Sequence, residues 1–264
     1  MIAAAALCPA APLLVRELTG GTLVLPELRE ACREVTGRLL RARPDVIAVV
    51  GAGPQTRAWD SASRLDVASF GGPAAARGPA AAAGGAAADR GAAGAAGAGP
   101  AGAARGAAGA VAGTLGLPAA LGLGARLLDE AGYAGPRRLE AIGLDETPAA
   151  CAAAGQRISQ AADRVGLLVM ADGSARRGRR APGHLDERSA GFDAGVERAF
   201  RDGDLQALAA IDPVLARELM AAGRAAWQVM AGALEGSGVD VEVLYADDPF
   251  GVAYLVASVG VRPD

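Results

Sequence analysis

The chain has 264 residues, of which 52% are hydrophobic and 3% aromatic, and its formal net charge is −3. A chain of this length can form one large α/β domain or two small ones, and its acidic balance argues against non-specific nucleic-acid binding. The single histidine, His184, excludes metal sites that need two or more histidines of one chain, and the lack of lysine excludes a P-loop and a Schiff-base amine. The cysteines, Cys8, Cys32 and Cys151, are too widely spaced for a CxxC metal site.

The first fifty residues predict a strand, a helix and a second strand. Residues 2–7 form a short apolar run that ends at a proline, which is typical of a buried strand. Residues 26–43 place apolar side chains on one helical stripe and begin at Pro26, which suits the first turn of a helix. Residues 46–50 (VIAVV) are continuously apolar, as a central parallel strand would be. This order defines a βαβ unit and therefore favours a parallel sheet.

Residues 70–112 differ from the rest of the chain. They consist almost wholly of Ala, Gly, Pro and Arg, without strand alternation or an amphipathic period. We interpret them as a low-complexity insertion within a single α/β domain that covers residues 1–264.

Regular periodicity returns after residue 115. Thr147 is expected to cap the helix that starts at Pro148. The expected helices are 121–131, 148–162, 188–201, 204–210, 213–220 and 224–235, and the expected strands are 139–144, 165–170, 239–246 and 251–261. The short turn between the last two strands predicts an antiparallel edge hairpin. The predicted fold is a three-layer α/β structure with a mostly parallel central sheet and helices on both faces.

Ligands of open α/β sheets bind outside the carboxyl ends of the strands. Four stretches are expected at that edge: residues 8–12, 51–54, 171–175 and the turn at Asp247 and Asp248. Together they supply one thiol, one hydroxyl and three carboxylates, and they contain no histidine.

Several motifs in this order resemble the class III extradiol ring-cleavage dioxygenases, in the subunit-B-like family that also includes Memo-like proteins. The stretch CPAAPLL (8–14) resembles the turn after the family's first strand, and LLVMADGSARR (167–177) resembles its strand ending in a Ser-His-Arg turn. Three further segments resemble the family's Phe-Asp helix with its Gly-Asp and Ile-Asp-Pro steps, the helix near its ligand carboxylate and its closing hairpin: 192–213, 226–234 and 245–257. The resemblance covers most of the chain outside residues 70–112.

The resemblance implies a site in which two histidines and a glutamate hold Fe(II), with another histidine as acid/base. This sequence departs from that pattern at each position. The first ligand falls on Ala10, the second near Pro54 or Gln55, and the acid/base histidine on Ala175. The carboxylate would fall within 223–227, where Arg224 is the charged residue and Glu218 is the nearest carboxylate. We therefore expect no metal site and no cofactor, and Fe(II) only if the family chemistry survives.

The candidate pocket at the carboxyl edge comprises these residues: Cys8, Ala10, Pro54, Asp172, Ser174, Ala175 and Arg176. His184 is expected in an exposed loop, with a displaced acid/base as the alternative. Arg176, Arg177, Arg179 and Arg180 are either a solvated loop or an anion clamp. Asp247 and Asp248 are expected to form a turn rather than a catalytic pair.

Three functions remain open at this point. The first is a non-catalytic binding or regulatory protein with the extradiol-dioxygenase-like fold but without its Fe(II) site. The second is a ring-cleavage oxidoreductase of catecholic substrates that uses unusual ligands or ligands from a partner chain, and the third is a nucleotide-type binder. The expected partners are a small anionic or aromatic ligand and a second copy or partner subunit, with no nucleic acid and no membrane. Reduced, widely spaced cysteines and the lack of a long apolar run predict a cytoplasmic location.

Overall fold

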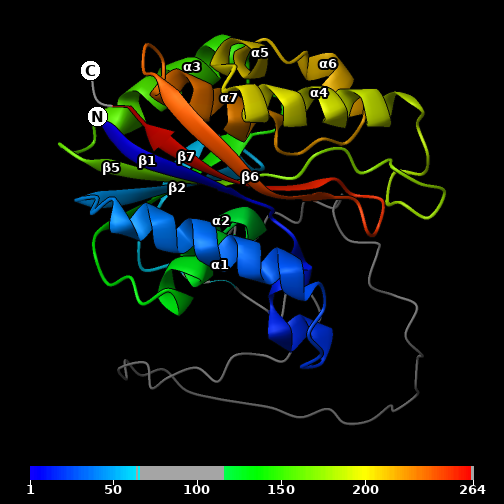
Figure 1. The fold of residues 1–264 in the computed structure, drawn as a ribbon, viewed down its shortest axis with the longest axis horizontal. Helices are drawn as coiled ribbons and strands as arrows, with labels where there is room; N and C mark the ends of the chain where they lie inside the picture. The colour runs from blue at the N-terminus through cyan, green and yellow to red at the C-terminus, as the bar shows by residue number, and fades with distance from the viewer. Residues whose placement is uncertain (64, 66–115, 263–264) are drawn as a thin grey trace, which may run out of the picture.

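The computed structural model describes residues 1–63, 65 and 116–262. Within these residues, a seven-stranded sheet has the order β3-β4-β2-β5-β1-β7-β6 (Figure 1). Its strands are β1 (Ile2–Cys8), β2 (Val46–Gly53), β3 (Arg57–Trp59), β4 (Arg137–Gly143), β5 (Val165–Met170), β6 (Val239–Asp247) and β7 (Tyr254–Val261). Strands β4, β2, β5 and β1 run parallel, whereas β3, β7 and β6 are antiparallel to their neighbours.

The central strands are continuously apolar because both of their faces are buried. Every residue of β5 is buried, as are the first six residues of β2, because helices cover both faces of the sheet at these positions. The edge strand β6 instead alternates between exposed acidic residues and partly buried valines, such as Asp240 and Val241. The mostly parallel sheet with an antiparallel edge hairpin confirms the predicted α/β fold.

Helices pack on both faces of the sheet (Figure 1). One face carries α1 (Pro26–Arg41) and α2 (Ala119–Glu130). The other face carries α3 (Pro148–Ser159), α4 (Arg188–Asp202), α5 (Leu205–Ala209), α6 (Pro213–Glu218) and α7 (Arg224–Ala233). Side-chain caps begin three of these helices, and Thr147 accepts a hydrogen bond from the amide of Ala150 as predicted.

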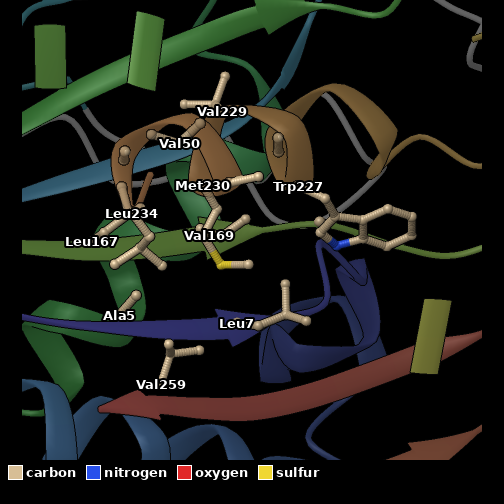
Figure 2. Packing of buried hydrophobic residues seen from close by; sticks show 14 of the residues in the cluster. Ala5, Leu7, Val50, Leu167, Val169, Trp227, Val229, Met230, Leu234 and Val259 are labelled. Carbon is tan, nitrogen blue, oxygen red and sulfur yellow. The ribbon is translucent and has the colours of Figure 1, made fainter. Parts of the chain in front are cut away.

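Each face of the sheet has its own apolar cluster. The cluster under α1 and α2 includes Cys8, Leu28 and Leu168, and the cluster under α3 to α7 includes Leu7, Val169 and Trp227. Figure 2 shows the second cluster, with α7 lying across the ends of β1 and β5. Neighbouring residues of one strand thus face opposite layers, which is the two-residue period of a strand.

Three short elements were absent from the sequence prediction. These are β3 and two 3-10 helices, η1 (Pro12–Leu14) and η2 (Arg16–Thr19). The predicted low-complexity insertion, residues 70–112, lies outside the described residues.

Among the residues that the structure describes, no helix is both long enough and apolar enough to cross a membrane.

Candidate functional site

The register of the sheet brings the four predicted stretches to one edge. Cys8 of β1 and Gly51 of β2 both align with Met170 of β5. Because β7 runs antiparallel to β1, its first residue, Tyr254, lies at the same edge, paired with Asp247 of β6. The carboxyl ends of the parallel strands therefore meet the start of the hairpin's second strand, as predicted.

Asp172 ties the ends of β1 and β5 together. Its Oδ1 accepts the amide N–H of Ala10 at 2.9 Å, just beyond the end of β1. Burial raises the pKa of Asp172 to about 7, and the Ala10 N–H offsets only part of that effect. The nearby carboxyl group also raises the pKa of Tyr254, although burial of the phenol is the larger cause. A carboxyl that titrates near neutrality thus lies under the candidate site.

Ser174 and Asp193 join the strand-end loop to α4. The hydroxyl of Ser174, which is fully buried, donates to Oδ2 of Asp193 at 2.5 Å, and its amide donates to Oδ1 at 2.9 Å. Burial raises the pKa of Asp193, while the bonds from Ser174 counteract the effect. Both oxygens of Asp193 thus accept from Ser174, which fixes the strand-end loop to α4.

Arg177 is compensated by two carboxylates. Its Nε donates to Asp248 at 2.7 Å and lies 3.7 Å from Asp193. Arg179 and Arg180 are exposed, as the solvated-loop interpretation expects. An anion bound at Arg177 would have to compete with these two acids, which argues against the anion-clamp alternative at this residue.

A pocket of about 220 Å³ lies between α4, the loop after β5 and the β6–β7 hairpin. Its acidic residues are Asp193, Glu197, Asp247 and Asp248, and Arg177 is its basic one. Val196, Trp227 and Leu255 contribute an apolar wall, and Tyr254 adds a second aromatic ring. Acidic and apolar linings together suit a ligand with a positive end and a hydrophobic body.

Trp227 closes the inner wall of this pocket from α7. The side chain is 1% exposed, and its indole Nε1 has no hydrogen-bond partner among the described residues. Figure 2 shows the ring projecting beyond Leu7, near the carboxyl end of β1. Phe200 of α4 packs edge-on against it, with ring centroids 6.3 Å apart.

The other predicted site residues are scattered around this edge. Cys8 is fully buried in the α1 face of the core, where its thiol contacts Cys32, so it does not line the pocket. Pro54 is exposed in the turn after β2. His184 is also exposed, in the left-handed region with a φ of 59°, in the loop before α4.

Ala175 and Arg176 belong to the loop that packs against α6. The amide of Ala175 donates to the carbonyl of Leu219, and the Ala175 carbonyl accepts from Gly183. Arg176 is half-buried, and its Nε has no hydrogen-bond partner among the described residues. Neither residue is among those that line the 220 Å³ pocket.

The residues present do not fit an Fe(II) site. A Cβ at Gly223 would lie 2.6 Å from the carbonyl oxygen of Asp172, so this position has no room for a ligand carboxylate. The buried guanidinium of Arg224 instead donates to the carbonyls of Leu144 and Glu146, and Glu218 pairs with Arg188. Among the described residues, no three His, Cys, Asp or Glu side chains are grouped as metal ligands.

Sequence reasoning missed the residues that define the pocket on α4 and α7. Asp193 lies nineteen residues from its partner Ser174, and Trp227 reaches the site from a helix whose apolar pattern indicates only a core face. The sequence signal that could have found Asp193 is an acid directly next to Phe192, a residue of the predicted helix's apolar stripe.

Comparison with known proteins identifies no family for this chain. No family model and no curated protein matches it. A solved structure, the crystal structure of the uncharacterized protein JW3007 from Escherichia coli K12, is similar over 97% of this chain and 98% of that chain, with 12% identity and a TM-score of 0.47.

Proposed function

We propose that this protein is a cytoplasmic, extradiol-dioxygenase-like protein without the Fe(II) site, and that it binds a small aromatic cation instead of cleaving a ring. The observation that carries the proposal is the pocket of about 220 Å³ at the carboxyl edge of the sheet, which combines acidic side chains with an aromatic wall. The lack of room for a carboxylate at Gly223 supports the non-catalytic half of the proposal.

The balance of charge favours a cation over an anion. Arg177 offsets part of the charge of Asp193 and Asp248, and Arg201 pairs with Glu197 at 2.7 Å. Asp247 has no guanidinium partner among the described residues; it accepts the amide of Asp248 and the hydroxyl of Tyr245. An ammonium group placed at Asp247 would therefore gain a charge-assisted hydrogen bond without breaking an ion pair.

The apolar wall favours an aromatic body on that cation. Trp227 and Tyr254 line the pocket together with Leu255, so a planar ring could bury its faces against apolar and aromatic surface.

Calorimetric titration with 2-arylethylamines and with arylpropionic acids of matched size tests this function. We expect the amines to bind and the acids not to bind. We expect Asp247→Asn to weaken amine binding by about tenfold, since a hydrogen bond to a charged group contributes roughly 1.5 kcal/mol. Asp240→Asn, on the same strand but paired with Arg262, is the matched control and should leave the affinity unchanged. Equal binding of acids and amines would overturn the proposal.

Loading with Fe(II) under anaerobic conditions tests the alternative, a ring-cleavage oxygenase with unusual or partner-supplied ligands. Bound iron and catechol-dependent oxygen uptake are the two measurements. We expect neither, because the family's first ligand position falls on Ala10, the second falls near Pro54 or Gln55, where there is no histidine, and residues 223–227 contain no carboxylate. Stoichiometric iron with turnover would establish the enzyme and exclude the non-catalytic function.

A further inference from the structure

A second cavity, of about 370 Å³, lies on the opposite face of the sheet from the candidate site. It is enclosed by α1, α2 and the two 3-10 turns that follow β1. Its charged residues are Arg16, Arg29, Arg33 and Glu130, and Leu14 and Leu127 are among its apolar ones. The volume falls in the lower part of the range of roughly 300–1,000 Å³ that is usual for small-molecule sites.

Arg29 is fixed in the wall of this cavity by backbone carbonyls. Its Nη1 donates to Leu14 at 2.7 Å, its Nη2 to Leu13, and its Nε to Val24 at 3.2 Å. These bonds use three of the five guanidinium N–H groups and join η1 to the chain after η2. Because carbonyls are neutral, they orient the guanidinium without cancelling its charge.

The acidic groups in and around the cavity form ion pairs with arginines other than Arg16 and Arg29. Glu17 and Glu130 both pair with Arg126, at 3.0 and 2.8 Å. Glu30 pairs with Arg33 on the exposed side of α1.

Two guanidinium groups remain without a carboxylate partner among the described residues, those of Arg16 and Arg29. Both line the same cavity. The pKa of Arg29 is lowered chiefly by burial and next by the charge of Arg16, whereas the charge of Glu130 acts in the opposite direction. Although the net charge of the protein is −3, this partly apolar cavity concentrates positive charge.

We propose that this cavity binds an organic phosphate monoester. The phosphate would lie between Arg16 and Arg29. Its charge of about −2 would be balanced by the two guanidinium groups, which would donate hydrogen bonds to its oxygens. The short organic part would lie against Leu14 and Leu127. This site is separate from the pocket of about 220 Å³ described above, which we call the acid-lined pocket. The phosphate proposal does not depend on the function proposed for the acid-lined pocket.

Calorimetric titration of the full-length protein with inorganic phosphate and with n-butyl phosphate, at low ionic strength, tests the proposal. We expect saturable binding of both, with butyl phosphate tighter because of the apolar wall. Failure of both to saturate up to about 10 mM would overturn the proposal. Equal affinity for the two would overturn the assignment to an organic phosphate.

Arg16→Gln is the decisive variant, because Arg16 is exposed and its guanidinium makes no described bond whose loss would disturb folding. We expect it to weaken butyl phosphate binding by about tenfold, the usual consequence of losing one charge-assisted hydrogen bond. Arg157→Gln, an exposed arginine on α3, removes the same net charge on the other face and should have no effect. Equal losses in both variants would mean a general effect of protein charge and would overturn the assigned site.

Discussion

Asp172 shows how one residue can connect the chemistry of this edge to the stability of the protein. Its carboxyl is buried and accepts the Ala10 amide, and its pKa is raised to about 7. In the unfolded chain the group would titrate near 3.9. Between these values the folded protein holds a proton that the unfolded chain has lost, so stability must fall as the pH rises through this window.

Asp172→Asn should therefore stabilise the protein above pH 7 and change little at pH 4. The amide oxygen of Asn retains the acceptor for the Ala10 N–H, while the side chain has no charge to desolvate. At roughly 1.4 kcal/mol per pKa unit, we expect a gain of about 2–4 kcal/mol at pH 8.

Urea unfolding at pH 4 and pH 8 measures this effect. Asp163→Asn, at an exposed acid, is the matched control and should behave like the wild type at both values. A variant that is less stable than the wild type at pH 8 would show that the ionised carboxylate contributes more than its burial costs.

Among the elements, the contact between α3 and α7 positions Trp227, the one residue of α7 that lines the acid-lined pocket. Gly155 of α3 lies directly against the backbone of α7, so an added Cβ would fall 2.1 Å from the carbonyl oxygen of Val229. A Cβ added at Gly232 of α7 would fall 2.5 Å from the Cα of Ala152 of α3. Small residues at this crossing let α7 approach α3 closely, and α7 carries Trp227 into the pocket.

Gly155→Ala should destabilise the protein by about 3 kcal/mol, because the clash is with backbone that can move only if the two helices separate. Gly195→Ala provides the contrast, since an added Cβ at this exposed position of α4 meets nothing within 4 Å. There alanine should stabilise the helix by about 0.5–1 kcal/mol. Urea midpoints of both variants measure the effect, and a neutral Gly155→Ala would show that α7 is free to shift.

Strands β5 and β3 show which elements can be predicted from the sequence and which cannot. Strand β5 was predicted with its observed bounds, because a continuous apolar run flanked by polar residues is a local signal. Strand β3 has only three residues, of which two are exposed, and exists because it pairs with the edge of β4. Pairing with a distant strand leaves no periodic pattern in the sequence, so such an element cannot be found locally.

The candidate site could likewise be predicted only in part from the sequence. The strand ends were predicted from the βαβ pattern, and Asp172 and Ser174 were placed at the correct edge. The residues from α4 and α7 were missed because their position depends on how helices pack across the sheet. Likewise, the sequence alone left a solvated loop and an anion clamp open at Arg177 and did not predict its ion pairs with acids of α4 and the hairpin.

On the scale of the whole molecule, the sheet separates two cavities of opposite charge. The acid-lined pocket lies on the α4 and α7 face, and the arginine-lined cavity lies on the α1 and α2 face. One covalent route joins them, since residues 9–16 lead from the Ala10–Asp172 hydrogen bond to the 3-10 turns of the arginine-lined cavity. Coupling between the cavities would need this segment to have two arrangements that the ligands distinguish.

We expect the two cavities to bind their ligands independently. Arg29 holds the segment through carbonyls of Leu13 and Leu14, and Asp172 holds its start at Ala10, so both ends are fixed in the same structure. The affinity for butyl phosphate should therefore change by less than about twofold when the protein is saturated with an arylethylamine, well under the roughly fivefold or larger effects of established allosteric couplings. Titrations with and without the second ligand measure this. If a larger change is found and Asp172→Ala, which removes the acceptor of the Ala10 N–H, abolishes it, the Ala10–Asp172 contact is the connection between the two faces.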